Sequence, residues 1–464
     1  MSTRRDILRS GLGLAVGATV GPWVQRSAGA ASLRDTGYRG IWFTLGQKSE
    51  FGDKYSGGLG TYTANHVPMA IYAKEVDKTF FVYGGSRGGQ RYLLNMISYY
   101  DHKKGTVPRP AIVHDKKGVD DPHDNPSLAI DPTGHIWVFV SGRAKARPGF
   151  IYRSREPYSI DDFEMVRQGE FTYPQPRWID GQGFLFLFTK YTKGRELYYA
   201  TSADGREWSA DTRFAGMGGH YQTSQQRGNK VITAFNYHPG GNVDKRTNLY
   251  YLSTDDFGHT WRNIAGEAVT LPLTEPVNPA LVHNYEADKR LVYIHDLDLD
   301  AAGRPAIVYT TSAGHAPGPS GDPRWWTVAH WNGTAWDYTE LTRGNHNYST
   351  GMLCVEGDQW RIFGPTDKGP QPIGSGGELA IWRSGDLGKT WQHERAITHD
   401  SPRNHNYIRH PVNAHADFYG YWADGDPDKL SISYLYFCNK AGDKVWRLPY
   451  DMTGDEAAPE LLKP

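Results

Sequence analysis

The sequence predicts an all-β protein, a seven-bladed β-propeller with four-stranded antiparallel blades. Gly (53 residues), Pro (28 residues) and aromatic residues (13%) are abundant, a composition that favours short strands joined by turns. A strand–turn–strand pattern also recurs along the chain, and a shorter turn signature accompanies it. A chain of 464 residues is too long for one ordinary compact core unless its architecture is repetitive.

The strand–turn–strand pattern supplies the expected inner strands of each blade. Each copy has an apolar run, a turn rich in Asp, Gly, Asn or Lys, and a second β-rich run. The average unit of about 59 residues suits four strands and their loops. We therefore expect one propeller domain at residues 36–452, followed by a C-terminal tail at 453–464. The copies begin at His66, His123, Tyr173, His220, Val277, Asn347 and His410.

The turn signature S-x-D-x-G-x-T-W, known as the Asp box, follows several of these copies. It is complete or nearly so at Ser202–Trp208, Ser253–Trp261 and Ser384–Trp391. We expect its Asp and Gly to hold a hairpin turn between the two outer strands of a blade, with the Trp packed against the blade. The signature indicates structure, and we assign it no catalysis.

The N-terminus has the features of an export signal. Arg4 and Arg5 precede a short apolar stretch rich in Gly and Ala, and Ala28 and Ala30 offer a small-residue cleavage site. This pattern predicts a twin-arginine signal at residues 1–30, and hence a periplasmic or extracellular protein; a membrane anchor is the alternative. Acidic and basic residues balance at 51 each, which favours neither a nucleic-acid partner nor a membrane partner after signal cleavage.

Residues at the ends of the inner strands should meet at one mouth of the central channel. Imidazoles, phenols and guanidinium groups gathered there would suit a sugar or an anion; the alternative is that they are turn or packing residues. Ahead of the first strands stand His66, His123, Tyr173, His220, Tyr221, Asn278, His346, Tyr348, His405 and Tyr407. After the second strands stand Arg143, Tyr191, Tyr237, His238, Asp296, Asp367, Lys368 and Asp424.

The tetrapeptide NHNY occurs twice, at Asn345–Tyr348 and Asn404–Tyr407. We expect both copies just before the innermost strands of blades six and seven, where they would present the same hydrogen-bonding set to one sugar-binding funnel.

Three residues share a register along the innermost strands of blades five to seven: His283, Cys354 and His415. Imidazole and thiolate facing one channel would suit a structural zinc ion, with calcium as the other candidate, whereas simple burial is the alternative. No cofactor is expected for the chemistry. The same register argues against a Cys354–Cys438 disulfide, because Cys438 is expected on an outer strand.

Long blocks of the chain resemble a known family. They include "DKYSGGLGTY" from Asp53, "HDNPSLAIDPTGHIWVF" from His123 and "RTNLYYLSTDDFGHTW" from Arg246. These blocks are similar to the BNR-repeat family that contains short ulvan lyases, and glycosidases acting on rhamnose–glucuronic acid linkages belong to the same wider group. The resemblance covers essentially the whole mature chain, and it implies breakdown of an acidic polysaccharide in which a uronic acid neighbours rhamnose.

The resemblance also implies catalytic residues. His123 matches the first histidine of the ulvan lyases, but the place of their second histidine holds Arg143. The family tyrosine corresponds to Tyr191 or Tyr237. Arg246 is the best match for the family arginine, and Arg195 is the next.

β-Elimination needs a base at C5 of the uronate, an acid at the leaving oxygen and a cation that neutralises the carboxylate. Arg143 or Arg246 would supply the charge and His123 one proton transfer. A tyrosine beside such an arginine is expected to have a lowered pKa and to serve as base or acid. A hydrolase releasing rhamnose, with His66 as its candidate residue, and a non-catalytic sugar-binding propeller remain as alternatives. A sialidase is disfavoured because its arginine triad cannot be assembled. The oligomeric state is left open.

Overall fold

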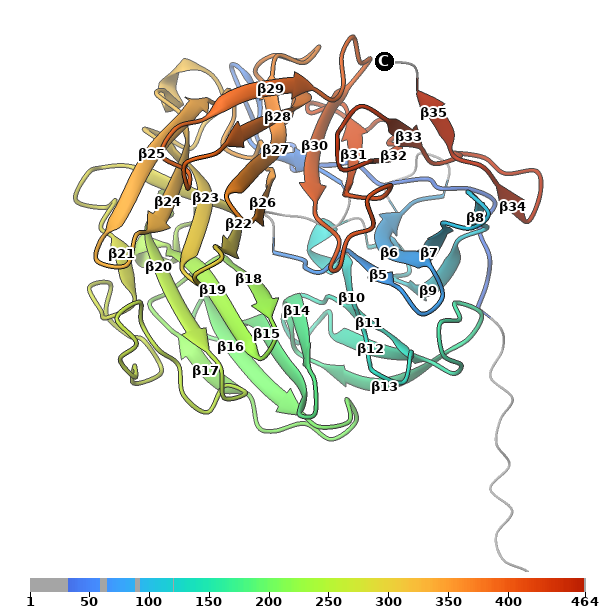
Figure 1. Cartoon of the computed structure of the whole chain (residues 1–464), viewed down its shortest axis with the longest axis horizontal. Helices are drawn as coiled ribbons and strands as arrows, with labels where there is room; N and C mark the ends of the chain where they lie inside the picture. Colours follow the sequence, from blue (N-terminus) through green and yellow to red (C-terminus); the bar gives the residue numbers. More distant parts are fainter. Residues whose placement is uncertain (1–31, 59–64, 88–91, 120, 463–464) are drawn as a thin grey trace, which may run out of the picture.

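Seven antiparallel sheets surround a central axis in the computed structural model (Figure 1), which describes residues 32–58, 65–87, 92–119 and 121–462. The expected signal at residues 1–30 lies outside the described residues. The predicted seven-bladed propeller is confirmed.

The strands of each blade follow one another in sequence from the axis outwards, except that blade one skips β8 and blade seven skips β34, which pair with each other. Blade one contains β5 (Ala70–Ala73), β6 (Lys78–Gly85), β7 (Leu94–Asp101) and β9 (Ala111–Asp115), and blade two contains β10 (Pro126–Ile130), β11 (Ile136–Val140), β12 (Gly149–Ser154) and β13 (Phe163–Gly169). Blade three contains β14 (Thr172–Ile179), β15 (Gly183–Tyr191), β16 (Arg195–Ser202) and β17 (Thr212–Ala215), and blade four contains β18 (Gln222–Arg227), β19 (Lys230–Tyr237), β20 (Thr247–Thr254) and β21 (Leu281–His283).

Blades five and six are four-stranded, and blade seven has a fifth strand. Blade five contains β22 (Leu291–Leu299), β23 (Pro305–Ser312), β24 (Trp325–Trp331) and β25 (Trp336–Arg343). Blade six contains β26 (Met352–Glu356), β27 (Gln359–Asp367), β28 (Glu378–Ser384) and β29 (Gln392–Ala396). Blade seven contains β30 (Asn404–Arg409), β31 (Gly420–Gly425), β32 (Leu435–Cys438), β33 (Val445–Arg447) and β35 (Glu460–Leu462).

Short two-stranded sheets and 3₁₀ turns accompany the seven blades. Two-stranded sheets pair β1 (Phe43–Thr44) with β4 (Ser56–Gly57), β2 (Lys48–Ser49) with β3 (Gly52–Asp53), and β8 (Val107–Pro108) with β34 (Glu456–Ala457). The 3₁₀ turns are η1 (Pro122–Asp124), η2 (Pro239–Gly241), η3 (Val243–Lys245) and η4 (Pro319–Gly321). The turn η1 lies near the centre of the ring (Figure 1). No helix in the described part of the chain is long and apolar enough to cross a membrane.

The core lies between the blades, because neighbouring sheets pack face to face. Second strands are therefore apolar on both faces: β6 reads KTFFVYGG and is buried after its first residue. Outermost strands are wetter, and every residue of β29 is exposed. This gradient explains why the inner strands gave the clearest sequence signal.

The Asp boxes lie where the sequence placed them, in the turns between third and fourth strands. In the β28–β29 turn, Asp386 Oδ1 accepts from the Thr390 amide (2.9 Å), and Ser384 Oγ accepts from the Gly388 amide (3.0 Å). The Trp391 indole donates to the Gly388 carbonyl (3.0 Å). These bonds satisfy the turn's backbone from within, as expected of a structural motif.

The ring is closed by packing between blades one and seven, each of which is contiguous in sequence. The N-terminal segment lies between them: the Tyr38 amide donates to the Pro449 carbonyl (2.9 Å) and the Asp35 amide to the Pro110 carbonyl (2.9 Å). One hydrophobic cluster spans the junction and includes Phe81 and Phe418, whose rings stack at 5.8 Å.

Two of the seven predicted inner pairs were wrong. The segment from Val277 begins with β21, the outermost strand of blade four, and its second run is β22, the innermost strand of blade five. The segment from His410 begins one strand late, because the innermost strand of blade seven is β30. In both places a loop with turn chemistry was taken for the hairpin between two inner strands.

The last residues are not a separate tail. The expected tail, 453–464, includes β34 and β35, which pair with β8 and β33, so the described part of blade seven extends to Leu462. Cys354 and Cys438 are buried and free, which confirms the prediction that they do not pair.

Candidate active site

A ring of tyrosines closes the end of the channel where the innermost strands begin. The tyrosines form one cluster with Phe43, and neighbouring tyrosine rings meet edge to face. The ring centroids of Tyr293 and Tyr348 are 5.3 Å apart, and those of Tyr173 and Tyr221 are 5.7 Å apart. Each ring is nearly inaccessible, so these residues pack against one another instead of lining the predicted open funnel together, and Tyr348 alone of the six borders the cavity described below. The members are Tyr55, Tyr173, Tyr221, Tyr293, Tyr348 and Tyr407.

Arg246 lies at the centre of this ring. Its guanidinium carbon is 4.2 Å from the ring centroid of Tyr293 and 4.7 Å from that of Tyr221, and Nη2 donates to the Tyr348 hydroxyl (2.8 Å). Cation–π contacts of this kind help to hold a buried guanidinium group. Arg246 therefore places a positive charge directly beneath the mouth.

Tyr293 was not predicted. Asn278 was the expected residue for blade five, because β21 was taken for the innermost strand of that blade. The signal was present: in β22, "LVYIHDLDL", the tyrosine stands near the strand start, as Tyr407 does in β30.

A histidine–carboxylate pair stands beside the tyrosine ring. The 3₁₀ turn η1 begins at Asp121, whose carboxylate caps the His123 amide and accepts a short hydrogen bond from His123 Nδ1. This bond favours the tautomer that carries the proton on Nδ1. Burial lowers the pKa of His123 to about 4, against the opposing pull of the Asp121 carboxylate. The imidazole is therefore neutral at neutral pH and equipped to act as a base.

Two arginines complete the Asp121 environment. Arg143 Nη1 (2.8 Å) and Arg147 Nη2 (2.7 Å) both donate to Asp121 Oδ2. Although burial by itself raises the pKa of Asp121, His123 and Arg147 outweigh it and hold that pKa far below its usual value. Asp121 is thus a permanent carboxylate. Neither it nor Arg147 was predicted, although "VDDPHDNP" shows a carboxylate two residues before the histidine.

Tyr191 stands between two guanidinium groups. The guanidinium carbons of Arg143 and Arg195 each lie 5.8 Å from its ring centroid. The expected lowering of the tyrosine pKa is wrong: burial raises the pKa of Tyr191 above its usual value, and the two arginines only moderate the rise. The phenol is protonated at neutral pH and suits an acid. Tyr237 does not join this cluster; it packs with the core near Tyr250.

The His123–Asp121 pair, Arg143, Arg147 and Arg195 border one cavity of about 310 Å³, and Tyr191 lies beside two of these arginines. The side chains of Arg143 and Arg147 are 38% and 31% exposed, so the cavity reaches solvent through an arginine rim. Lys54 also lines it and forms an ion pair with Asp244, a residue pair that the sequence analysis did not identify. The lining residues are Phe43, Leu45, Gln47, Lys54, Asp121, His123, Arg143, Arg147, Arg195, Val243 and Tyr348.

The other predicted histidines are structural. His66 is fully buried, and its Nε2 contacts the His123 carbonyl (3.2 Å). His220 accepts from the Met217 amide (3.2 Å) and donates to the Asn236 carbonyl (2.7 Å), so both nitrogens serve the backbone. His346 is buried and accepts from the Tyr348 amide (3.1 Å). These three residues support the mouth from below and do not face the cavity.

His405 belongs to a different cavity. It accepts from the Trp422 indole (2.9 Å) and contacts Ser401 Oγ (2.9 Å). With Arg403 and Tyr436 it borders a space of about 650 Å³ between β29 and the outer strands of blade seven. This cavity is the larger one, but it contains none of the His123 group.

The two NHNY copies interlock. The first copy precedes β26, as predicted, whereas the second forms the start of β30 and does not precede it. The Asn406 side chain donates to the Tyr348 carbonyl (2.9 Å) and accepts from the Thr350 amide (2.9 Å). The repeat thus joins blade seven to blade six and sets two tyrosines of the ring.

The predicted metal ligands are not together. His283 lies on β21 at the outside of blade four, 2.6 Å from Asp288. Cys354 is on β26 in the core between blades six and seven. His415 lies in the β30–β31 loop, beside His102 and Asp417. The register was wrong because His283 and His415 are not on innermost strands.

Comparisons with known proteins agree with this architecture. The profile of the BNR repeat-containing family matches residues 95–344. The ulvan lyase PL25 of Pseudoalteromonas sp. (strain PLSV) is 24% identical over 325 residues, 60% of this chain and 63% of that protein. An ulvan lyase of Nonlabens ulvanivorans is 24% identical over 274 residues, 50% of this chain and 57% of that protein. The chain thus spans about three fifths of the length of these relatives.

Solved structures show the same fold. A PL25 ulvan lyase bound to -[GlcA(1-4)Rha3S]- superposes with a TM-score of 0.72 at 18% identity, covering 88% of this chain and 96% of that chain. The polysaccharide lyase Uly1 superposes with a TM-score of 0.60 at 14% identity, covering 86% and 97%.

Proposed function

The chain belongs to the BNR repeat-containing family, and on this basis we propose that it is a polysaccharide lyase that cleaves a glucuronate–rhamnose polymer by β-elimination. The observation that carries the proposal is that the His123–Asp121 pair, Arg143 and Arg195 border one cavity, with Tyr191 beside both arginines. The similarity to ulvan lyases supports the substrate class.

Binding would begin at the arginines. The uronate carboxylate pairs with Arg143 or Arg195, with Arg246 adding positive charge from beneath. These charges neutralise the carboxylate, so they stabilise the enolate-like intermediate that forms when C5 loses its proton. Guanidinium groups keep their charge at any working pH and match a carboxylate with two parallel hydrogen bonds.

Proton transfers would then use two different side chains. His123 Nε2 takes the C5 proton, the electron pair forms the C4–C5 double bond, and the C4–O bond breaks. Tyr191 gives its hydroxyl proton to the departing oxygen. Solvent returns the proton from the imidazolium to the phenolate. The neutral imidazole and the protonated phenol are the states that these roles require.

Arg143 fits this scheme although the ulvan lyases that the sequence resembles have a second histidine in its place. Its guanidinium both anchors Asp121 and faces Tyr191. A permanent cation here strengthens carboxylate binding but cannot transfer a proton, which leaves one base and one acid in the cluster.

A retaining or inverting hydrolase is less well supported. Such enzymes use two carboxyl groups at the scissile bond, one of them protonated. Asp121 is the one carboxylate in the lining of the described cavity, and its ion pairs keep it ionised. His66, the candidate for histidine-based hydrolysis, does not line this cavity, and its Nε2 contacts the His123 carbonyl (3.2 Å).

The test is incubation of the full chain with ulvan and with gum arabic. The expected result is a rise in ultraviolet absorbance from the new conjugated double bond, with reducing ends appearing in parallel. His123→Ala should lower the rate by about 10²–10⁴-fold. His283→Asn, on the outside of blade four, is the control and should keep the rate.

Two results would refute the lyase. Reducing ends without absorbance would establish a hydrolase. An unchanged polymer that is nevertheless retarded with the protein in an affinity gel would establish a binding propeller.

We also propose export through the N-terminal signal. Arg4 and Arg5 ahead of the apolar stretch support it, and a polysaccharide substrate would be met outside the cell. Arg4→Lys together with Arg5→Lys should leave the protein in the cytoplasmic fraction of an expressing bacterium. Unchanged export of this variant would contradict a twin-arginine route.

A further inference from the structure

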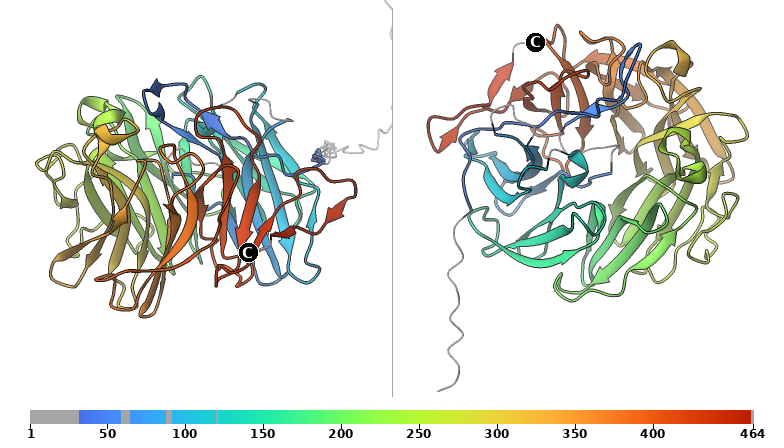
Figure 2. Two further views of the ribbon diagram at one scale, coloured as in Figure 1. Left: turned by 90° about the horizontal axis from the view of Figure 1, so that it is seen from above. Right: turned by 180° about the vertical axis from the view of Figure 1, so that it is seen from behind.

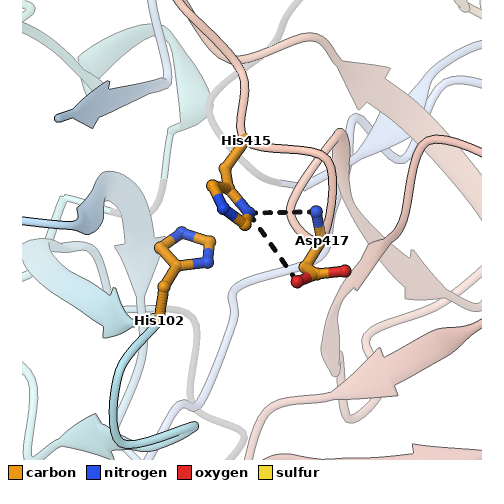
Figure 3. Close-up of side chains that lie close together, drawn as sticks. All are labelled: His102, His415 and Asp417. Carbon is orange, nitrogen blue, oxygen red and sulfur yellow. Dashed lines mark hydrogen bonds and ion pairs between the residues drawn. The ribbon is translucent and has the colours of Figure 1, made fainter.

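We infer that His102, His415 and Asp417 form a binding site for a divalent transition metal, zinc above all, that clamps blade seven to blade one. Each residue offers one ligand atom, and these atoms lie within 4.8 Å of one another. His102 follows β7 in blade one, whereas His415 and Asp417 lie in the β30–β31 loop of blade seven (Figure 3).

Local turns bring the three side chains together. In blade seven the Phe418 amide donates to the His415 carbonyl (3.0 Å), closing a tight turn that sets Asp417 beside His415. In blade one the Asp101 carboxylate accepts from the amides of Lys103 and Lys104 (3.1 Å each), which fixes the hairpin that carries His102. Both groups are therefore held by backbone and not by long flexible side chains.

The two blades are also tied together next to the site. The Tyr72 amide donates to the Val412 carbonyl (2.9 Å), and the Val412 amide donates to the Ala70 carbonyl (2.9 Å). The Tyr72 ring lies 5.4 Å from the His102 ring and 5.1 Å from the His415 ring. A metal between the imidazoles would thus strengthen an existing junction, at which blades one and seven share no strand.

The hydrogen bonding of the His102 side chain is compatible with a role as a metal ligand. Its Nε2 contacts Thr79 Oγ1 (2.8 Å), and its buried Nδ1 has no hydrogen-bond partner among the described residues. When His102 Nε2–H donates a hydrogen bond to the threonine hydroxyl, the lone pair on Nδ1 is available for a metal. This arrangement is typical of metal-bound histidines.

The close approach of the imidazoles points the same way. Their ring centroids are 3.9 Å apart (Figure 3), and the Asp417 carboxylate supplies negative charge 3.8 Å from His415 Nδ1. Tetrahedral zinc has bonds of about 2.0–2.2 Å and so needs ligand atoms about 3.3 Å apart, which modest side-chain rotation would achieve. Two imidazoles and one carboxylate suit zinc with a water as fourth ligand, whereas calcium prefers six or more oxygens.

The site stands apart from the proposed catalytic cavity. Turns that follow third strands, such as the one carrying His102, and loops between first and second strands, such as the one carrying His415, lie at the face opposite the starts of the innermost strands. The metal would therefore act on ring closure and take no part in elimination.

The test uses untagged full-length protein freed of metal with a chelator. Zinc titrated by calorimetry should bind at one ion per chain, and saturating zinc should raise Tm by about 2–5 °C. Cobalt should give the visible absorption of a tetrahedral nitrogen–oxygen site. His415→Asn and Asp417→Asn should each abolish both the Tm rise and the cobalt spectrum.

His283→Asn is the matched control, because His283 is also a partly exposed histidine beside an aspartate but has no third ligand group. It should keep the full metal response. The proposal is overturned if the wild type binds no zinc below about 100 µM, or if His415→Asn binds and is stabilised as the wild type is. A His102→Asn variant that is less stable in chelator while the other variants retain the zinc response would also overturn it, since His102 would then act only in packing.

Discussion

At the scale of single residues, the Asp121–His123 pair determines when the proposed base is active. The imidazole must be neutral to accept the C5 proton, and burial lowers its pKa to about 4. We therefore expect kcat/KM to stay high as pH falls from 7 to 5 and to decline only below about pH 4 to 5. Initial rates from short incubations across this range provide the measurement. A decline centred near 6.5, the value of a solvated histidine, would contradict the assigned environment.

Asp121 is expected to act through His123. Asp121→Asn keeps the size of the side chain but removes the acceptor charge that holds the Nδ1 proton. The imidazole can then present the wrong nitrogen, so kcat should fall by about 10²–10⁴-fold with a smaller change in KM. Circular dichroism serves as the control for folding. A change confined to KM would assign Asp121 to substrate binding.

Arg143 and Arg195 flank Tyr191 symmetrically, so their contributions can be separated by substitution. Arg143→Lys retains a charge but loses the fork that reaches Asp121, and we expect a loss of about 10-fold in kcat/KM; Arg143→Ala should lose about 10²–10³-fold. Comparison with Arg195→Lys and Arg195→Ala shows which of the two guanidinium groups binds the uronate carboxylate of the substrate. Equal rates for Lys and Ala at both positions would refute a role for charge here.

At the scale of elements, the NHNY repeat acts as a joint between blades. Asn406 is fully buried and bridges to the Tyr348 carbonyl and the Thr350 amide. Asn406→Ala leaves those backbone groups unsatisfied, so the free energy of unfolding should fall by about 2–4 kcal/mol in denaturant titrations. Asn345, the first residue of the first copy, is only partly buried and bonds the Pro372 and Gly376 carbonyls (3.2 Å each) and Ser349 Oγ (3.1 Å), groups that water can reach more easily, so Asn345→Ala should cost less than half as much. Equal losses would mean that the repeat has no special bridging role.

The same scale shows what sequence could and could not predict. Strand–turn–strand patterns located five inner pairs because those strands are apolar on both faces and their turns are short. Blades five and seven were misassigned because β21 and the β30–β31 loop carry the same residue types as an inner hairpin. Tyr293 and His102 were missed for a related reason: their partners Arg246 and His415 come from other blades, and single-sequence patterns do not reveal contacts between distant segments. Asp121 was missed although its partner His123 is only two residues away.

At the scale of the whole molecule, the propeller buries an unusual amount of imidazole. These side chains sit between blades, where they bond backbone groups such as the Asn236 carbonyl. Burial lowers their pKa values, to about 4 for His220 and about 3 for His405. In the described part of the chain, the buried histidines are His66, His123, His220, His238, His295, His330, His346 and His405.

This burial makes the fold sensitive to acid. The unfolded chain takes up a proton on each histidine near pH 6.5, whereas the folded chain resists protonation until about pH 3 to 4. Between these values the unfolded state holds more protons, so the free energy of unfolding falls as pH falls from 6.5 towards 4. Denaturant titrations at half-unit steps should show a monotonic loss. His220→Gln should reduce the slope by about 1.4 kcal/mol per pH unit, the share of one proton, in that window. A stability that is flat from pH 7 to 4 would mean that the histidines are protonated inside the fold, and it would remove the basis for a neutral His123 as well.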